Sequence, residues 1–114
     1  MDYTVEYHLN RKADVVREIY DLIMAAARQF GDVVEDPKKT SIHLVRKSAF
    51  AGISMQRNSL VLTLKSKVEI TDRRVRRSEP LSAQRWHNEI KITSPDELDQ
   101  VVLGWLKDSY EISE

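Results

Sequence analysis

Four arginines fall within five positions of the stretch DRRVRRSEP, which runs from Asp72 to Pro80. They are Arg73, Arg74, Arg76 and Arg77, and Arg85 follows a few residues later. A guanidinium group donates two parallel hydrogen bonds to a phosphate, so the cluster is typical of phosphate binding. A polar run that contains a proline is equally typical of a solvated loop. We therefore predict a loop over residues 71–84 and treat its arginines as candidate phosphate ligands.

The arginine stretch belongs to a basic middle segment of the chain. Residues 38–91 hold thirteen Lys and Arg against four acids, a formal charge of +9. Residues 1–37 carry −4 and residues 92–114 carry −5, so the whole chain is neutral. This asymmetry favours nucleic acid or another polyanion as the partner. A solvated sheet face with lysines at its edges would give the same pattern.

The candidate anion-binding surface combines basic residues of this segment with two aromatic neighbours. The aromatic pair is included because rings next to an arginine stack on nucleic-acid bases. The candidate residues are Lys38, Lys39, Arg46, Arg57, Arg73, Arg74, Arg76, Arg77, Arg85, Trp86 and His87.

One short pattern points to an enzyme. Glu89-Ile90-Lys91 matches the acid-x-Lys half of the PD-(D/E)xK nuclease motif, with Asp72 as a first carboxylate. Two such carboxylates would hold Mg²⁺, and the lysine would steady the attacking water. Any solvent-facing strand also reads Glu-x-Lys when its charges pair across strands. The pattern therefore supports a nuclease only as a third hypothesis.

The sequence contains no motif for other kinds of catalysis. The absence of cysteine excludes disulfides, thiolate chemistry and the common zinc clusters. His8, His43 and His87 lack metal-ligand spacing, and the three glycines form no phosphate loop. No serine lies in a G-x-S-x-G elbow. We predict no catalytic residue, no metal and no cofactor.

Length and composition indicate one globular domain, which we place at residues 1–114. No apolar run reaches transmembrane length. The N-terminus MDYTVEYHLN lacks the basic and apolar regions of a signal peptide. We expect a cytoplasmic protein that does not associate with membranes.

Hydrophobic periodicity predicts a helix at each end of the chain. Residues 13–30 form the first strong helix, and Gly31 follows it as a C-terminal glycine. Residues 94–110 form the last helix, with Ser94 as N-cap and Glu97 completing a capping box. Residues 2–9 fit either a helix capped by Asp2 or a strand, and we favour the helix. Gly104 lies inside the last helix, where we expect it to admit a close packing neighbour.

Alternating apolar residues predict strands between the helices. After a short β-branched pair at 33–34 and a turn at 36–39, the predicted strands span 41–46, 49–56, 60–67 and 85–92. Gly52 lies within the second of these, where we expect a bulge or a close backbone approach. The order predicts a two-layer α+β fold. Its sheet is mostly antiparallel, a meander plus a later strand, and an N-terminal helical segment and a C-terminal helix pack on one face.

Several stretches resemble a known family: FGDVVEDPKKTSIHLVRKSAFAGI, LVLTLKSK and SPDELDQVVLGWLKDSYE. They are similar to the small prokaryotic family filed as domain of unknown function 5655, over nearly the whole chain. The resemblance implies a compact α+β domain. Some relatives are joined to predicted nuclease or other DNA-linked domains, which implies a link to nucleic acid.

These observations lead to a ranked set of functional hypotheses. The first is a non-enzymatic binding module, whose basic sheet face and arginine loop meet an anionic partner such as nucleic acid. The alternative is a small structural or regulatory domain that acts as a homodimer. The nuclease is third.

Overall fold

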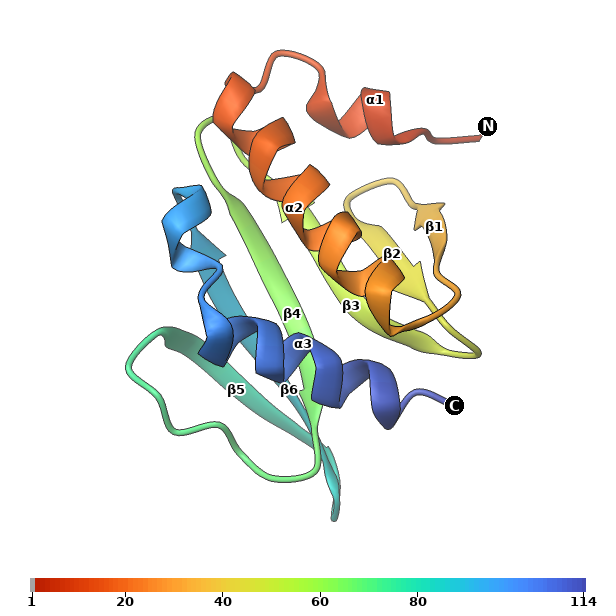
Figure 1. Ribbon diagram of the computed structural model, residues 1–114, viewed down its shortest axis with the longest axis vertical. Helices are drawn as coiled ribbons and strands as arrows, with labels where there is room; N and C mark the ends of the chain where they lie inside the picture. The colour runs from red at the N-terminus through yellow and green to blue at the C-terminus, as the bar shows by residue number, and fades with distance from the viewer. Residues whose placement is uncertain (1) are drawn as a thin grey trace.

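The computed structural model describes residues 2–114, and it places helices on one side of a single sheet (Figure 1). The elements, in chain order, are α1 (Val5–Leu9), α2 (Asp14–Phe30), β1 (Val34–Pro37), β2 (Ile42–Val45), β3 (Ala49–Met55), β4 (Leu60–Ser66), β5 (Val75–Ser82), β6 (Arg85–Ile92), the 3-10 turn η1 (Pro95–Glu97) and α3 (Gln100–Glu111).

The sheet has six strands in the order β1-β2-β3-β4-β6-β5, and every neighbouring pair is antiparallel. Strands β2, β3 and β4 form the expected meander, and β1 extends it by one strand. The turn predicted at 36–39 is partly wrong, since Asp36 and Pro37 belong to β1. The chain then crosses to the far edge as β5 and returns as β6 between β5 and β4. The predicted α+β class is confirmed, and this crossover brings β4 next to β6.

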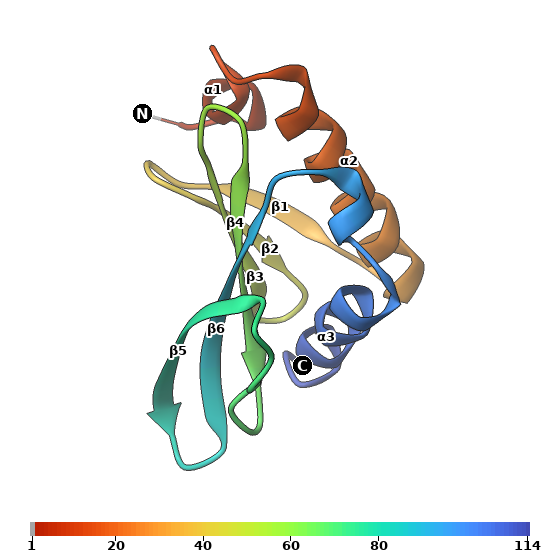
Figure 2. The same ribbon diagram turned by 90° about the vertical axis from the view of Figure 1, so that its left-hand side faces the viewer.

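Helices α2 and α3 lie on the same side of the sheet and leave its other face open (Figure 2). The core between the layers holds fully buried aliphatic side chains from both, such as Ile19, Leu62 and Leu106. Burying each contributes roughly 1.5–3 kcal/mol. Since the sheet turns its apolar side toward the helices, its remaining side chains point outward from the open face.

Helix α2 ends at Phe30, directly before Gly31, as the sequence predicted. Gly31 has φ 153°, a conformation that residues with a Cβ rarely adopt. A Cβ at this position would also clash with the hydroxyl of Tyr110. That hydroxyl donates to the Asp32 carbonyl at 3.0 Å, which ties α3 to the end of α2.

Two predicted helix caps are wrong. Thr4, not Asp2, caps α1, because its hydroxyl accepts from the Tyr7 amide at 3.0 Å. Ser94 precedes only the short turn η1, and Asp99 caps α3 by accepting from the Val102 amide at 3.0 Å. The reason is the same in both cases. More than one short polar residue near the start of each helix is suited to the N-cap position, so residue type alone does not identify the cap.

The loop predicted over residues 71–84 is also wrong, because residues 75–82 form strand β5. An edge strand pairs on one side only, so its residues stay exposed and its sequence stays polar. Pro80 is tolerated there because a missing amide costs nothing on an edge. The buried Asn88 of β6 anchors the strand, accepting from the Ser78 hydroxyl at 2.9 Å.

Gly104 was expected to admit a close neighbour, and this too is wrong. It is exposed on α3, and a Cβ there would meet nothing within 4 Å. Within residues 2–114, no helix has the length and apolarity to cross a membrane.

Candidate anion-binding site on the open sheet face

Arg74 of the arginine stretch serves the fold. Its Nε lies 3.0 Å from Asp72 Oδ1, and its Nη1 lies 2.7 Å from Asp99 Oδ2. Its guanidinium also lies 5.1 Å from the ring centre of Trp105. Both carboxyl groups have pKa values below their ordinary range, Asp72 mainly because Arg74 donates to it and Asp99 mainly because the Val102 amide does. Arg74 therefore ties the segment before β5 to the start of α3.

Arg76 and Arg77 on β5 also have acidic neighbours. Glu89 of β6 lies 3.5 Å from Arg76 and 3.9 Å from Arg77. Arg77 is also paired with Glu79 at 3.2 Å. Arg73 is exposed and takes part in none of the ion pairs found in residues 2–114. Most of the arginine stretch is thus neutralised from within the protein.

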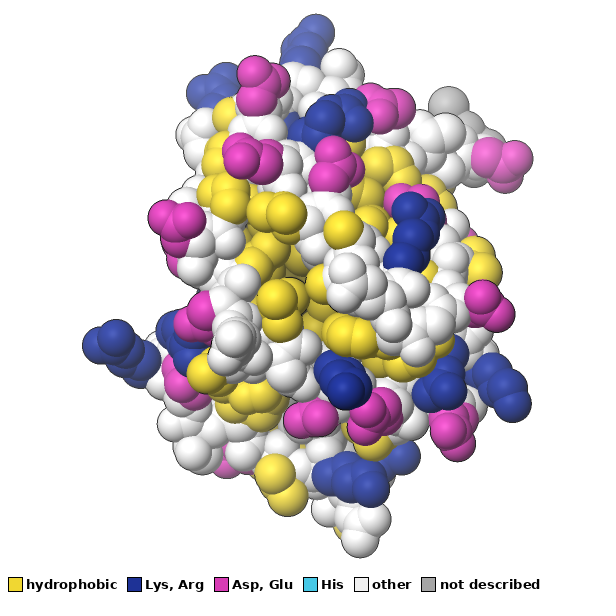
Figure 3. Space-filling model, in the orientation of Figure 1, with side chains coloured by type: hydrophobic (Ala, Val, Ile, Leu, Met, Phe, Trp, Pro, Cys, Tyr) yellow, Lys and Arg dark blue, Asp and Glu magenta, His cyan; other side chains and the backbone are white. Residues whose placement is uncertain are grey.

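The remaining candidate cations lie at different ends of the strands. Lys38 and Lys39 lie in the β1–β2 turn and Arg57 in the β3–β4 turn, at one end of the antiparallel sheet. Arg46 lies in the β2–β3 turn at the other end, where it donates to the Tyr110 carbonyl at 3.1 Å. The helix-side surface mixes acidic and basic side chains (Figure 3). The structure therefore does not bring all the candidate residues together.

Three basic side chains do gather on the open face, of which Lys65 and Arg85 are charged at neutral pH. Lys65 of β4 stands opposite His87 of β6 in the register, and Arg85 lies two residues before His87 on the same strand. Within the described part of the chain, Lys65 and Arg85 form no ion pair with a carboxylate. The Lys65 ammonium donates to the Ser48 hydroxyl at 3.2 Å. We call Lys65, Arg85 and His87 the cationic cluster.

The cluster changes the acidity of its own members. Partial burial lowers the pKa of Lys65, and the charge of Arg85 lowers it further. Partial burial also lowers the pKa of His87, and Lys65 adds to this effect while Glu79 opposes it. Uncompensated like charges at one place are a common feature of anion sites. A bound anion would relieve this repulsion.

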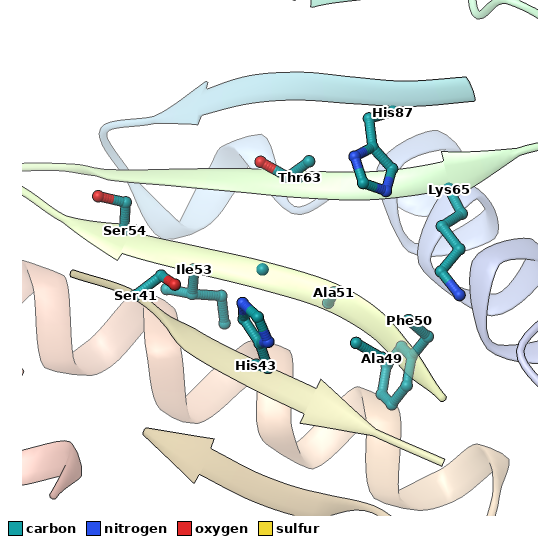
Figure 4. Close-up of a pocket in the computed structure, with 11 residues that line it drawn as sticks. Ser41, His43, Ala49, Phe50, Ala51, Ile53, Ser54, Thr63, Lys65 and His87 are labelled. Carbon is teal, nitrogen blue, oxygen red and sulfur yellow. The ribbon is translucent and has the colours of Figure 1, made fainter. Parts of the chain in front are cut away.

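Beside the cluster lies a hollow of about 410 Å³ (Figure 4). This volume falls within the roughly 300–1,000 Å³ of small-molecule pockets. Histidines stand on two sides of it, His43 from β2 and His87 from β6, and Lys65 closes one end. Ser54 and Thr63 add hydroxyl groups from β3 and β4.

Gly52 lies at the centre of the hollow, between His43 and Thr63 in the register. The expected bulge is not at Gly52, since the shift between β2 and β3 falls at Leu44 and Val45. A Cβ at Gly52 would meet only the Thr63 Cβ, at the ordinary contact distance of 3.8 Å. The expected close backbone approach is therefore also wrong. The missing side chain instead leaves the hollow open.

Residues 5–113 of the chain match the family described as Domain of unknown function (DUF5655). The chain belongs to this family. No curated protein and no solved structure matches it. Membership of DUF5655 names no activity, so functional arguments rest on the site itself.

In this DUF5655 domain, the sequence predicted only some of the residues that form the cationic cluster and the hollow. Arg85 and His87 were candidates. Lys65 was counted in the basic segment but not among the candidate residues, and His43 and Gly52 were not assigned to an anion site. Trp86 points to the side opposite His87, since successive residues of a strand alternate. The two rings therefore share no single stacking surface. Alternation could have placed Lys65 on the open face, but its pairing with His87 depends on the crossover of β5.

The carboxylates of the nuclease pattern are bound by arginines. Asp72 is paired with Arg74, and Glu89 lies beside Arg76 and Arg77. Over residues 2–114, no three His, Asp or Glu side chains are grouped so as to hold a metal ion. The geometry thus adds no support to the third hypothesis.

Proposed function

We propose that this domain is a non-enzymatic binding module that captures an anionic partner on its open sheet face. The observation that carries the proposal is the cationic cluster. Within residues 2–114, Lys65, Arg85 and His87 lie together without a carboxylate ion pair, while Arg74, Arg76 and Arg77 are each matched by acids. Holding like charges together is unfavourable, so an anion that joins them gains binding energy.

The rest of the open face limits how such a partner lies. The register places Asp36 beyond His43, Glu89 beyond Thr63 and Glu79 beyond His87. These carboxylates are themselves ion-paired, Asp36 with Lys38, Glu79 with Arg77, and Glu89 with Arg76 and Arg77. A polyanion laid across the sheet would therefore gain most at the cluster, where Lys65 and Arg85 have no carboxylate partner within the described residues, and nucleic acid would be held at one or two phosphates.

A titration with inorganic phosphate tests the proposal. Amide shifts of the isotope-labelled chain should move at residues 65, 85 and 87, and the affinity should fall as salt is raised. Lys65→Gln should weaken binding, whereas Arg57→Gln, which removes an exposed cation from the opposite end, should not. Unchanged shifts at low salt would refute the proposal. A single-stranded (dT)₁₀ titration in parallel shows whether nucleic acid is an acceptable carrier of the phosphate.

A homodimer is a second proposal, favoured by strand β1. This strand lies at the sheet edge, and Val34 is 60% exposed. Its outer side has no partner strand among the described residues, so its backbone groups are available to pair with the same strand of another copy. Light scattering over a range of concentrations tests this, and a constant monomer mass would exclude it.

A further inference from the structure

Gly52 has no role that the fold explains. It lies inside a regularly paired strand, where glycine costs about 0.5–1 kcal/mol relative to alanine. Its backbone has no positive φ, and alanine would fit in ordinary contact with Thr63. What glycine does provide is space above the strand, in the centre of the hollow.

The walls around this space carry unused hydrogen-bonding groups. Ser54, Thr63, His43 and His87 all line the hollow. Among the described residues, none of these side chains makes a hydrogen bond within the protein. Their donors and acceptors are therefore free for a bound molecule.

The shape of the space favours a flat ring. Neighbouring strands lie about 4.8 Å apart, so His43 on β2 and Thr63 on β4 are separated by about 10 Å across Gly52. The floor at Gly52 is bare backbone without a side chain. Imidazole rings on two sides offer further planar surfaces for stacking (Figure 4).

The charges favour a single anionic group. Lys65 and His87 close one end of the hollow, next to Arg85. Asp36 and Glu89 lie in the same row of the sheet as Gly52, on either side of it. One anion at the end with Lys65 is well placed, whereas the row itself offers a second anion only carboxylates that are already ion-paired, Asp36 with Lys38 and Glu89 with Arg76 and Arg77.

We propose that the hollow over Gly52 binds a small molecule with a flat aromatic body and one anionic group. The ring lies over Gly52 between His43 and His87, and the anion reaches Lys65. This inference rests on the proposed anion-binding function and narrows it to a ligand class. A nucleotide base with its phosphate or an aromatic carboxylate shares this chemistry.

Three probes separate the ring from the charge in an amide-shift titration of the full chain. Naphthalene-2-sulfonate has both, methanesulfonate has only the anion, and naphthalene-2-sulfonamide has only the ring. We expect the first to bind at least tenfold more tightly than either of the others, with shifts at residues 43, 52, 54 and 63. Adenosine monophosphate and 2-naphthoate, compared in the same way, then distinguish a nucleotide from an aromatic carboxylate.

Two glycine variants provide the matched comparison. Gly52→Val fills the hollow and should weaken naphthalene-2-sulfonate binding at least tenfold while leaving methanesulfonate binding unchanged. Gly104→Ala, on the exposed side of α3, should change neither. Gly52→Ala replaces the valine variant if the latter does not fold, with a smaller loss in the same direction.

The outcomes distinguish this inference from the proposed function. If both sulfonates bind equally and Gly52→Val has no effect, the ring site is refuted and the anion site stands. If no anion shifts the cationic cluster, both are refuted. If the signals around Gly52 instead depend on protein concentration, the occupant is a second copy of the chain, and the small-molecule site is refuted.

Discussion

Lys65 and His87 stand opposite each other on β4 and β6, 22 positions apart in the sequence, and both side chains lie on the same open side of the sheet. The charge of Lys65 helps to lower the pKa of His87. The two strands are neighbours only because the chain passes through β5 before it returns as β6. The crossover therefore creates the site.

Removing Lys65 should raise the pKa of His87. In Lys65→Gln the repulsion disappears, while partial burial and the attraction of Glu79 remain. A proton NMR titration of the imidazole measures this change. Arg57→Gln serves as the control and should leave the titration unchanged, and an unaltered His87 pKa in Lys65→Gln would contradict the arrangement described.

The stability of the protein should fall on mild acidification because of His87. Its pKa in the folded chain lies below the ordinary value of 6.5, so the unfolded chain takes up the proton first. The contribution of His87 is fully present above about pH 6.5 and is lost as the pH falls through the folded-state pKa. Urea unfolding of the wild type and His87→Gln across this range should show a shallower pH dependence for the variant.

Gly52→Ala should raise the free energy of unfolding by about 0.5–1 kcal/mol. Alanine fits at the 3.8 Å contact with Thr63 and reduces the freedom of the unfolded chain. Urea denaturation measures the change. A destabilised variant would show that Gly52 serves the fold and would remove the argument for an open hollow.

Gly31→Ala should have the opposite effect and destabilise the protein by more than about 1 kcal/mol. The residue has φ 153°, and a Cβ would displace the Tyr110 hydroxyl from Asp32. The same denaturation experiment applies, with Gly104→Ala as a control that should stabilise the protein by up to about 1 kcal/mol, because it replaces an exposed glycine inside a helix. Equal stabilities for all three alanine variants would contradict this account of the glycines.

Arg74→Ala should lower stability without lowering anion affinity. The variant loses the links to Asp72, Asp99 and Trp105 that hold the segment before β5 to α3. A lower urea midpoint together with unchanged phosphate binding is the expected pair of results. Arg73→Ala is its matched control and should leave both unchanged. Lost phosphate affinity in a folded Arg74→Ala protein would place the anion site on the arginine stretch instead.

The sequence predicted those elements whose periodicity was clear. Helix α2 and strand β6 each bury one face, so their spacing of apolar residues was decisive. Strand β5 was missed because its side chains stay half-buried or exposed along its whole length, leaving no apolar alternation. The start of α3 was misplaced because Ser94 and Asp99 both suit a cap, and the choice depends on where α3 meets Arg74.

The candidate site was only partly predictable for a different reason. Charge patterning identified the basic segment, but it did not show which cations meet acids. Arg76 is neutralised by Glu89 across strands, while Lys65 is not neutralised at all within the described residues. Such pairings follow from sheet order, and a simple meander would have placed β5 rather than β6 beside β4. A glycine inside a predicted strand was recognisable as unusual at position 52. The sequence did not show that its missing side chain leaves a hollow on the open face of the sheet.

The most direct test of the anion site is the pKa of His87 measured with and without saturating inorganic phosphate. An anion held between Lys65 and His87 stabilises the imidazolium, so phosphate should raise this pKa. In Lys65→Gln the phosphate-induced rise should be much smaller. A His87 pKa that phosphate leaves unchanged would contradict an anion site on the open face.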